Sequence, residues 1–519
     1  PPARLEGPVM ESKPLVVVGG GTAGTAAAIE AARAGVQVTL IDENPISASM
    51  MGLNVPQFFG SRFTADLRDK SRMLERVASD NEALSEAQEV GVEVRLGTCV
   101  WGAFRNSETS RVLDGPQLGL SNGERSWLMK YDRLIVAAGS RDLGIPFAGW
   151  DLAGAMGANG ANALMGRYDA LSSRRMVVLG SGNLGVNTAK MALDRGIEVA
   201  GVVDVSPSVR GDEALMAQLR GEGVELYSSH TVKEAVGSDG EIESVTLVEI
   251  DEDCRPVPGT EKDISADTVC LAIGLVPNIE LLSLLGCELS FKSELGGYVP
   301  VHDDRMRTSV DTVLVAGDVA GFHDEMVPDT EYARRQGRMA GIAVAESLGT
   351  IAREEAITRI ADLRATSAES TPTEVHSHWK RWLQSSVNAG GEDIIVCRCE
   401  EVTCGDVIDT RPPRYLGWES EQMSRRNLGT LMKDGPVNPN YVKRLTRVGT
   451  GHCQGRLCRE QVSMLLAEES GTDVADIPFL SYRPPVRPLP LKVMWPHEET
   501  EQVRMDWPKW FSPTNQVLG

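Results

Sequence analysis

The sequence predicts an α/β protein in which two nested domains are followed by a small, mostly helical domain and an extended C-terminal tail. Two observations predict the α/β part. The segments 14–46 and 176–205 each place a strand, a glycine-rich turn, a helix and a second strand in that order. A third observation, four cysteines between positions 397 and 458, sets the small domain apart. A chain of 519 residues has room for about two to four domains.

Each strand–helix–strand unit is justified by its apolar pattern. In the first unit, Leu15–Val18 is a continuous apolar run of the kind found in buried parallel strands. Ala23–Arg33 is an alanine-rich helix that Gly35 ends, and Val36–Ile41 is the next strand. The second unit repeats this order with a strand at Met176–Leu179, a helix at Asn187–Arg195 and a strand at Glu198–Val203.

Composition excludes several classes of function. Lys and Arg number 52 against 73 Asp and Glu, and the formal net charge of −21 argues against nucleic acid as a partner. No apolar run reaches the ~18 residues of a transmembrane helix, and no secretory signal is visible. The nine cysteines form no regular disulfide framework. We therefore expect reduced thiols and a cytoplasmic location.

The first glycine turn has the pattern G-x-G-x-x-G. Gly19 permits a tight turn, Gly21 lets the backbone approach a pyrophosphate, and Gly24 lets helix and strand pack closely. The phosphates then meet the N-terminus of the helix. Asp42 ends the second strand, where a ribose-binding acid belongs, and Glu43 is the neighbouring candidate. A glycine turn without a ligand is the alternative.

Two later strand ends extend this prediction. One apolar strand ends at Ala138 and Gly139, and another ends at Gly317 and Asp318. With the glycine turn, these motifs resemble the two-dinucleotide-binding, glutathione-reductase-like flavoproteins over roughly residues 14–345. The resemblance implies two nested Rossmann-like dinucleotide-binding domains, FAD in the first domain, and an Asp318 carboxylate that holds the flavin ribityl chain.

The resemblance also defines a set of candidate residues and one departure. The A-x-x-x-G-R motif at 333–338 matches the family's helix that starts near the flavin. Disulfide reductases of the family carry a cysteine pair beside the flavin, whereas residues 44–60 contain no cysteine, so this chain is not a dithiol reductase. The predicted contacts in the first site are Gly19, Gly21, Thr22, Ala23, Gly24, Asp42, Glu43, Val100, Ala138, Gly139, Gly317 and Asp318.

The second glycine turn predicts a second nucleotide site. Gly180, Gly182 and Gly185 repeat the spacing after a strand, and Asp204 ends the following strand as a candidate ribose acid. In the family this domain takes NAD(P)H. No basic cluster follows the strand immediately to meet a 2′-phosphate, which favours NAD over NADP. An empty or repurposed fold is the alternative.

The four cysteines form the pattern C-x-C, a gap of 53 residues, and C-x4-C: Cys397, Cys399, Cys453 and Cys458. Four thiolates brought together predict zinc or a small iron–sulfur cluster, and zinc sites more often use C-x2-C pairs. The turn at 449–451 lets the backbone approach the sulfurs, and a helix is expected to open at Cys453 and to run to about Glu469. Structural zinc and two unrelated thiol pairs are the alternatives.

The cysteine segment resembles the [2Fe-2S] domain of the bacterioferritin-associated ferredoxin type. We expect the first dinucleotide-binding domain at 12–165 and 290–350, the second at 166–289 and a helical linker at 351–392. The cluster domain follows at 393–475. A tail at 476–519, with Trp495, Trp507, Trp510 and Phe511, contacts a partner subunit or its own body.

Taken together, the motifs and the R-P-P-V-R-P-L-P-L tail resemble the α (B-type) subunits of heteromeric dye-linked amine and amino-acid dehydrogenases. That group includes octopine and nopaline oxidases, proline and hydroxyproline dehydrogenases, hydrogen cyanide synthase and heterotetrameric sarcosine oxidase. The resemblance implies a hetero-oligomer in which a β subunit, similar to D-amino-acid oxidase, oxidises the C–N bond. This chain would carry electrons to an unidentified acceptor through a flavin and a [2Fe-2S] cluster.

Several points stay open. In relatives the first site holds FAD, NAD or ATP; an FMN at the subunit contact and a small γ subunit are further options. No catalytic residue is predicted in this chain. One rival hypothesis is a self-contained NAD(P)H-dependent FAD/[2Fe-2S] reductase. Another is a scaffold for iron–sulfur assembly or iron handling.

Overall fold

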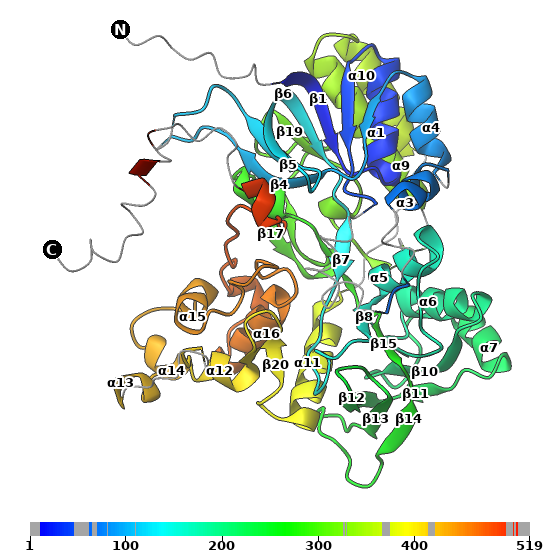
Figure 1. Ribbon diagram of the computed structural model, residues 1–519, viewed down its shortest axis with the longest axis vertical. Helices are drawn as coiled ribbons and strands as arrows, with labels where there is room; N and C mark the ends of the chain where they lie inside the picture. Colours follow the sequence, from blue (N-terminus) through cyan, green and yellow to red (C-terminus); the bar gives the residue numbers. More distant parts are fainter. Residues whose placement is uncertain are drawn as a thin grey trace.

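The structure is a computed structural model. It describes residues 11–45, 62–64, 70–79, 81–108, 111–324, 327, 330–365, 374–413, 421–494, 502, 505 and 506. The predicted fold class is confirmed: two α/β units, stacked along the long axis in Figure 1, are joined on one side by a mostly helical unit. The four aromatic residues of the predicted tail, from Trp495 onwards, lie outside the described residues.

A seven-stranded sheet forms the upper unit in Figure 1, in the order β3-β2-β1-β6-β5-β4 with β19 paired to β6. Strand β6 changes partners along its length: it pairs antiparallel with β5 at its start and parallel with β1 and β19 at its end. The carboxyl ends of β1, β2, β6 and β19 therefore share one edge, where open parallel sheets bind ligands. The strands are β1 (Ser12–Val18), β2 (Val38–Ile41), β3 (Glu93–Arg95), β4 (Cys99–Phe104), β5 (Gln117–Ser121), β6 (Ser126–Val136) and β19 (Val313–Val315).

Helices lie beside this sheet, and the closest pair is α1 (Thr22–Arg33) and α9 (Thr330–Ser347). A Cβ added at Gly337 would lie 2.0 Å from the carbonyl oxygen of Ala23, and one at Gly341 would lie 2.5 Å from that of Ala27. Only glycine allows two helix backbones to approach this closely. The other helices of this unit are α3 (Lys70–Ser79), α4 (Glu82–Glu89) and α10 (Arg353–Ala365).

The second unit contains a five-stranded parallel sheet in the order β11-β10-β9-β15-β8. Its strands are β8 (Ala155–Gly157), β9 (Arg175–Leu179), β10 (Glu198–Asp204), β11 (Leu226–Ser228) and β15 (Thr268–Leu271), and its helices are α5 (Ala158–Asn162), α6 (Asn183–Asp194) and α7 (Glu213–Gly221). An antiparallel sheet of β12 (His230–Val236), β13 (Ser244–Glu249) and β14 (Lys262–Ser265) adjoins it. Helix α6 begins four residues before its predicted start because Gly182 serves as its N-cap.

Two short strands connect the α/β units. Strand β7 (Ser140–Asp142) pairs antiparallel with β16 (Leu275–Pro277) and runs between the upper and lower units in Figure 1. Downstream of β16 come α8 (Glu280–Leu284) and the hairpin of β17 (Leu289–Lys292) and β18 (Gly297–Pro300). The chain therefore leaves the first unit after β6 and returns to it before β19, which is the predicted nesting. Edge strand β8 joins the second sheet ahead of the expected boundary at 166.

The third unit is mostly helical and does not form a separate core. Its buried residues, among them Trp379, Trp382 and Val462, belong to the same hydrophobic cluster as Val177 and Val203 of the second sheet. Its elements are α11 (His376–Gly390), β20 (Ile395–Cys397), β21 (Val402–Thr403), α12 (Cys404–Ile408), α13 (Glu421–Ser424), α14 (Leu428–Leu431), α15 (Pro439–Thr446) and α16 (Arg459–Ser470). The last helix, α17 (Leu491–Met494), lies at the upper unit instead, where Lys492 pairs with Glu124. We infer that the helices of the third unit and the second α/β unit are stabilised together.

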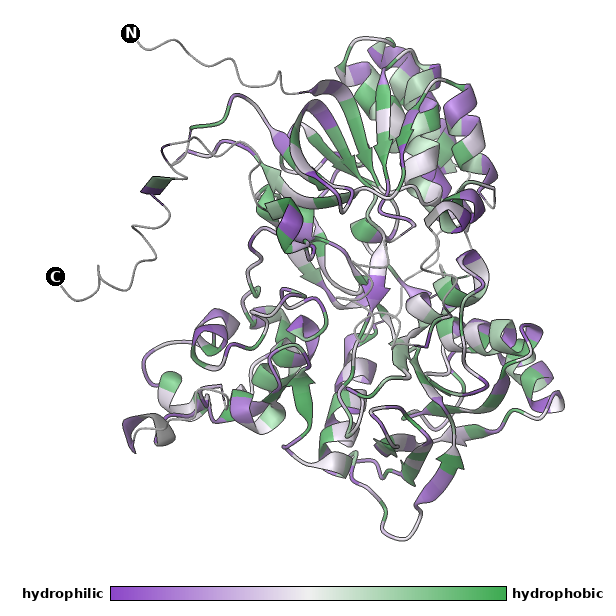
Figure 2. Cartoon of the chain, in the orientation of Figure 1, coloured by the Kyte–Doolittle hydropathy of each residue, from purple (hydrophilic) through white to green (hydrophobic). Residues whose placement is uncertain are grey.

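Apolar residues follow the strands of the upper sheet, which Figure 2 shows mostly in green, while the outer helix faces carry purple polar residues. The first core cluster joins that sheet with α1, α9 and α10. Within the described part of the chain, no helix is both long and apolar enough to cross a bilayer.

Candidate functional site

The first glycine turn has the geometry of a nucleotide-binding turn. Gly19 has a φ of +107°, and a Cβ there would lie 2.1 Å from the carbonyl oxygen of Ala137 on the neighbouring strand end. A Cβ at Gly24 would lie 1.8 Å from the carbonyl oxygen of Gly19. At Gly21, the N-cap of α1, a Cβ would meet no atom within 4 Å. The first and third glycines thus pack the turn tightly, whereas the second faces open space, as ligand approach requires.

Two acidic residues follow β2, and they differ in their partners. Asp42 accepts hydrogen bonds from the backbone N–H of Gly20 at 2.6 Å and from that of Asn44 at 2.7 Å, which fixes its carboxylate beside the glycine turn. Burial raises the pKa of Asp42. Glu43 instead forms an ion pair with Arg487, its Oε2 lying 2.6 Å from Nη2. Asp42 is therefore the better placed ribose-binding candidate of the two.

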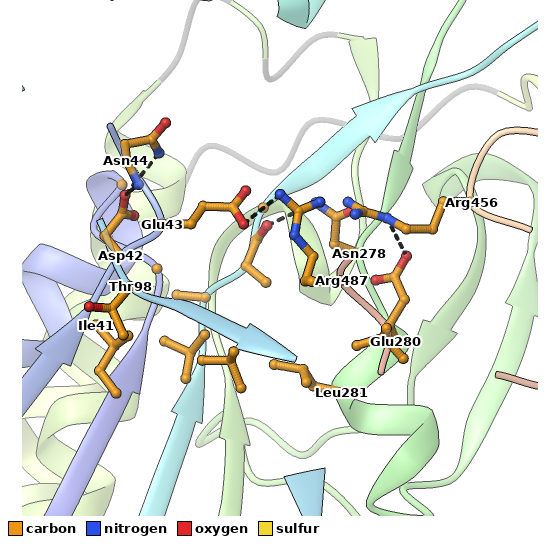
Figure 3. A pocket seen from close by; sticks show the side chains of 18 of the residues that line it. Ile41, Asp42, Glu43, Asn44, Thr98, Asn278, Glu280, Leu281, Arg456 and Arg487 are labelled. Carbon is orange, nitrogen blue, oxygen red and sulfur yellow. Dashed lines mark hydrogen bonds and ion pairs between the residues drawn. The ribbon is translucent and has the colours of Figure 1, made fainter. Parts of the chain in front are cut away.

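A cavity of about 220 Å³ opens at this edge of the sheet. Seven of the predicted residues line it: Gly19, Gly21, Asp42, Glu43, Val100, Ala138 and Gly139. Figure 3 shows the opposite wall, which the sequence did not predict: Asn278, Glu280, Leu281, Arg456 and Arg487 come from distant segments of the chain. Thr98 and Val486 also contribute, and Val486 is held by a hydrogen bond from its N–H to the carbonyl oxygen of Trp101.

The remaining predicted residues of the first site do not line this cavity. Thr22 and Ala23 begin α1, and a Cβ at Gly317 would lie 2.8 Å from the Cβ of Ala23. Asp318 lies outside the cavity lining, and its Oδ2 accepts a hydrogen bond from Ser140 Oγ at 2.8 Å. Burial raises the pKa of Asp318. These residues connect the glycine turn, β19 and the start of β7.

The A-x-x-x-G-R motif has a packing role in this structure. Gly337 forms the close contact with α1, and Arg338 donates through Nε to Glu30 of α1 at 2.8 Å. Arg359 of α10 pairs with the same carboxylate. The motif therefore fixes α9 and α10 on the helix that carries the first glycine turn.

The second glycine turn repeats the backbone geometry of the first. Gly180 has a φ of +110°, and a Cβ at Gly185 would lie 1.9 Å from the carbonyl oxygen of Gly180. At the N-terminus of α6, however, the backbone N–H groups of Asn183 and Leu184 donate to the carboxylate of Asp324 at 2.5 and 3.2 Å. A Cβ at Gly182 would meet the same carboxylate at 2.9 Å. An internal carboxylate thus holds the position where a pyrophosphate would bind.

Asp204, the predicted ribose acid of the second turn, is also engaged internally. It is 1 % exposed, and it accepts from the N–H and hydroxyl of Ser181 at 2.7 and 2.8 Å. Nε2 of His378 in α11 lies 3.7 Å from Oδ1 of Asp204, and burial lowers the pKa of His378 to about 4. Trp379 of the same helix lies against Gly274, where a Cβ would be 2.6 Å from the ring. Helix α11 therefore covers this end of the second fold.

The four predicted cysteines converge. The Sγ atoms of Cys397 and Cys399 are 3.9 Å apart, and those of Cys399 and Cys453 are 3.6 Å apart. Cys458 lies beside Cys397 as its hydrogen-bond partner. The contact with Cys397 and burial raise the pKa of Cys399 to about 12, so four adjacent ionised thiols need a cationic centre. Within the described ranges, no group of three or more His, Cys, Asp or Glu side chains is arranged to hold a metal ion.

The backbone around the cysteines confirms the predicted turn and corrects the predicted helix. The N–H of Gly449 donates to Cys397 Sγ at 3.5 Å, and a Cβ at Gly451 would lie 2.6 Å from Cys399 Sγ. The helix does not open at Cys453. It begins at Arg459, because Gln454 and Gly455 have φ values of 55° and 75°, which no right-handed helix accommodates.

Several arginines near the thiols contact other groups instead of the sulfur atoms. Arg447 pairs with Glu400 at 2.7 Å, and Arg398 stacks 5.0 Å from the Trp150 ring. Arg459 pairs with Glu460. Part of the positive charge near the thiols is therefore neutralised by these ion pairs.

A buried ion-pair group joins the cysteine loop to the first unit. Arg141 of β7 donates to Glu460 of α16 at 3.0 Å through Nη2 and to the carbonyl oxygen of Arg456 at 2.6 Å through Nε. Arg456 Nε lies 3.3 Å from Glu280 Oε1. Each side chain of this group is less than 9 % exposed: Arg141, Glu280, Arg456 and Glu460. The cavity at the first glycine turn and the cysteine loop are therefore adjoining parts of one structure.

Comparisons with known proteins agree with this architecture. A family model described as pyridine nucleotide-disulphide oxidoreductase matches residues 13–347, and one described as sarcosine oxidase A3 domain matches residues 420–496. An opine oxidase subunit of Agrobacterium tumefaciens (strain Ach5) is 27% identical over 507 residues, which cover 92% of this chain and 90% of that protein. Hydrogen cyanide synthase subunit HcnB of Pseudomonas aeruginosa is 28% identical over 505 residues, covering 92% and 97%.

Among solved structures, L-proline dehydrogenase from P. horikoshii matches with a TM-score of 0.62 at 20% identity and covers 94% of this chain and 81% of that one. This match shows a shared fold. The resemblance to subunits of the amine and amino-acid dehydrogenase group, predicted from the motifs, is confirmed by these relatives. The chain is an oxidoreductase, and it belongs to the pyridine nucleotide-disulphide oxidoreductase family.

Proposed function

We propose that the chain is the flavin- and [2Fe-2S]-containing electron-transfer subunit of a heteromeric dehydrogenase or oxidase that acts on the C–N bond of an amino acid or secondary amine. Substrate oxidation takes place in a partner β subunit similar to D-amino-acid oxidase. The full-length relatives support this proposal because they are named as subunits of opine oxidase and hydrogen cyanide synthase. An FMN at the subunit contact and a small γ subunit belong to the same proposal.

One observation carries the proposal: Arg456, within the cysteine loop, also lines the nucleotide cavity. A flavin takes up two electrons from an oxidised substrate, and an iron–sulfur cluster passes electrons one at a time. Placing the two side by side gives the flavin a one-electron outlet. The acceptor beyond the cluster is a separate molecule whose identity this chain does not determine.

The spacing of the cysteines supports a [2Fe-2S] cluster over a single zinc ion, because zinc sites more often use C-x2-C pairs than C-x-C and C-x4-C pairs. The sulfur contacts of 3.6 and 3.9 Å bring Cys453, Cys399 and Cys397 together in one place. In the proposal Cys397, Cys399, Cys453 and Cys458 hold the cluster, and the N–H of Gly449 donates to Cys397 Sγ. When bound, the cluster supplies one-electron transfer.

The first cavity supports an adenine nucleotide, and we propose FAD. The open space at Gly21 suits the pyrophosphate, Asp42 the ribose, and Val100 the adenosine end. These contacts are common to FAD, NAD and ATP. Asp318 favours FAD because this buried carboxylate lies at the sheet edge where the ribityl chain of a flavin would pass. When bound, FAD supplies two-electron acceptance.

The second fold supports the repurposed alternative over NAD(P)H entry. Asp324 takes the phosphate position at α6, and helix α11 covers the edge at Asp204 and Gly274. Hydride transfer from a nicotinamide bound here would require both Asp324 and helix α11 to move. The self-contained NAD(P)H reductase is therefore the weaker proposal, and the iron-handling scaffold leaves the nucleotide cavity without a role.

The proposal is tested by anaerobic reduction. The purified chain, alone and with its co-expressed partner, is mixed with NADH or with a candidate amine such as proline, sarcosine or an opine. We expect bleaching of flavin and cluster absorbance by one of the amines only when the partner is present, and none by NADH. Rapid bleaching of the isolated chain by NADH would overturn the proposal in favour of the reductase.

A further inference from the structure

The side chain of Arg456 leaves the cysteine loop and enters the wall of the nucleotide cavity. Arg456 lies between Cys453 and Cys458, it is 7 % exposed, and it shares the cavity lining with Gly19 and Gly21. Glu280 contacts its Nε from one side at 3.3 Å, and the rest of the guanidinium points toward Arg487 (Figure 3). One residue thus belongs both to the cysteine loop and to the cavity.

Arg487 reaches the same cavity from the C-terminal segment. Its guanidinium lies 2.6 Å from Glu43, next to the predicted ribose acid, and it is 8 % exposed. The neighbouring residue Val486 is hydrogen-bonded to Trp101 of β4, which fixes this segment at the sheet edge. Figure 3 shows the guanidiniums of Arg456 and Arg487 directed toward one another, so two positive charges face the same space.

Two buried guanidiniums that face each other repel, and burial weakens the screening of that repulsion. Among the described residues, the ion-pair group around them contains the guanidiniums of Arg141, Arg456, Arg459 and Arg487 and the carboxylates of Glu43, Glu280 and Glu460, an excess of positive charge. The open end of helix α1 at Gly21 adds its own preference for an anion. An anionic group in the cavity would offset the repulsion between the two guanidiniums and the excess of positive charge, and it would interact favourably with the start of α1. Phosphate fits the geometry of the guanidinium fork.

We propose that Arg456 and Arg487 bind the phosphate groups of the nucleotide in the first cavity, and that Arg456 thereby links nucleotide binding to the conformation of the cysteine loop. This inference rests on the proposed nucleotide in that cavity. Arg141 strengthens the link because its Nε holds the carbonyl oxygen of Arg456 at 2.6 Å. The shared chemistry is a diphosphate on adenosine, so the inference holds for FAD, NAD or ATP.

The test compares ADP with adenosine as calorimetric probes of the full-length chain, after dialysis to remove any retained nucleotide. We expect Arg456→Gln and Arg487→Gln each to weaken ADP binding by about 10- to 100-fold, because each removes a charge-assisted hydrogen bond. Adenosine binding should change little. Arg456→Lys should recover part of the ADP affinity, and Arg425→Gln, at an exposed arginine that follows α13, should leave it unchanged.

A double variant separates phosphate binding from folding. Arg456→Gln alone leaves Glu280 with one partner fewer, whereas Glu280→Gln with Arg456→Gln keeps the charge balance. The double variant should fold like the wild type and still bind ADP weakly. In the wild type, ADP should also shift the visible circular dichroism of the cluster, and in Arg456→Gln it should not.

The outcomes distinguish this inference from the proposed function. If Arg456→Gln loses ADP and adenosine equally, or loses neither, the inference is overturned while the nucleotide site stands. If the wild type binds neither probe, the nucleotide site itself fails. An unchanged cluster spectrum on ADP binding would overturn the link through Arg456 even if the affinities behave as expected.

Discussion

Gly451 leaves no room for a side chain beside the cysteines. A Cβ at this position would lie 2.6 Å from Cys399 Sγ, and the proposed cluster would prevent this sulfur from moving away. We expect Gly451→Ala to lower the free energy of unfolding by about 1–3 kcal/mol, as overpacking does, and to lower the iron content of the purified chain.

Gly435 offers a matched control in the same domain. It has no unusual φ, and a Cβ there would meet no atom within 4 Å. Gly435→Ala should therefore keep both stability and iron content. Iron analysis and chemical denaturation of the two variants decide the matter, and a Gly451→Ala protein with wild-type iron would contradict the assignment of Cys399.

At the scale of elements, the contact between α1 and α9 depends on Gly337. A methyl group there would lie 2.0 Å from the carbonyl oxygen of Ala23, a backbone atom that cannot rotate away. Gly337→Ala should cost about 1–3 kcal/mol of folding free energy. Gly221→Ala in α7, where a Cβ meets nothing within 4 Å, should instead stabilise by about 0.5–1 kcal/mol. The melting temperatures of the two variants measure both effects. If both substitutions shifted the melting temperature in the same direction, the proposed contact between α1 and α9 would be contradicted.

The elements show what local sequence can and cannot predict. The two glycine turns were predictable because the backbone approach at Gly19 and Gly180 tolerates no other residue, and strand and helix periodicity flanks each turn. The start of α16 was not predictable from helix signals. Gln454 adopts a left-handed φ, which a glutamine does not favour, because the turn around the sulfurs imposes it. Asp324 was missed because it reaches α6 from 140 residues away.

For the whole molecule, Glu460 connects the cysteine domain to the first unit through Arg141. Burial alone raises its pKa, but Arg141 and Arg459 outweigh burial, and the pKa of Glu460 lies below its usual value of 4.5. The linked stability is therefore present above pH 4.5 and lost as the pH falls through the lower pKa of the folded state.

Glu460→Gln should lower the free energy of unfolding by about 3–5 kcal/mol near neutral pH, because it leaves Arg141 buried with one ion pair fewer. The difference from the wild type should shrink in acid. Lys492→Gln, which breaks an exposed ion pair with Glu124, should change stability by less than about 1 kcal/mol at any pH. Denaturation at several pH values measures both, and a pH-independent effect of Glu460→Gln would contradict the ion-pair account.

The cavity shows the limit of sequence reasoning at this scale. Its floor was predictable because Gly19, Gly21 and Asp42 follow one another along a single strand–helix–strand unit. Its opposite wall was not, because Asn278, Arg456 and Arg487 meet only after the second unit and the C-terminal segments have packed on the first. That the four cysteines lie together, by contrast, could be predicted, because two closely spaced thiol pairs favour a shared soft metal centre.

The most direct test of the account is the metal and sulfide content of the purified chain, prepared anaerobically and read together with its electron paramagnetic resonance spectrum after reduction. The account predicts about two irons and about two acid-labile sulfides per chain and a one-electron signal that is lost in Cys397→Ser. One zinc per chain, with neither iron nor sulfide, would contradict the electron-transfer role of the four cysteines.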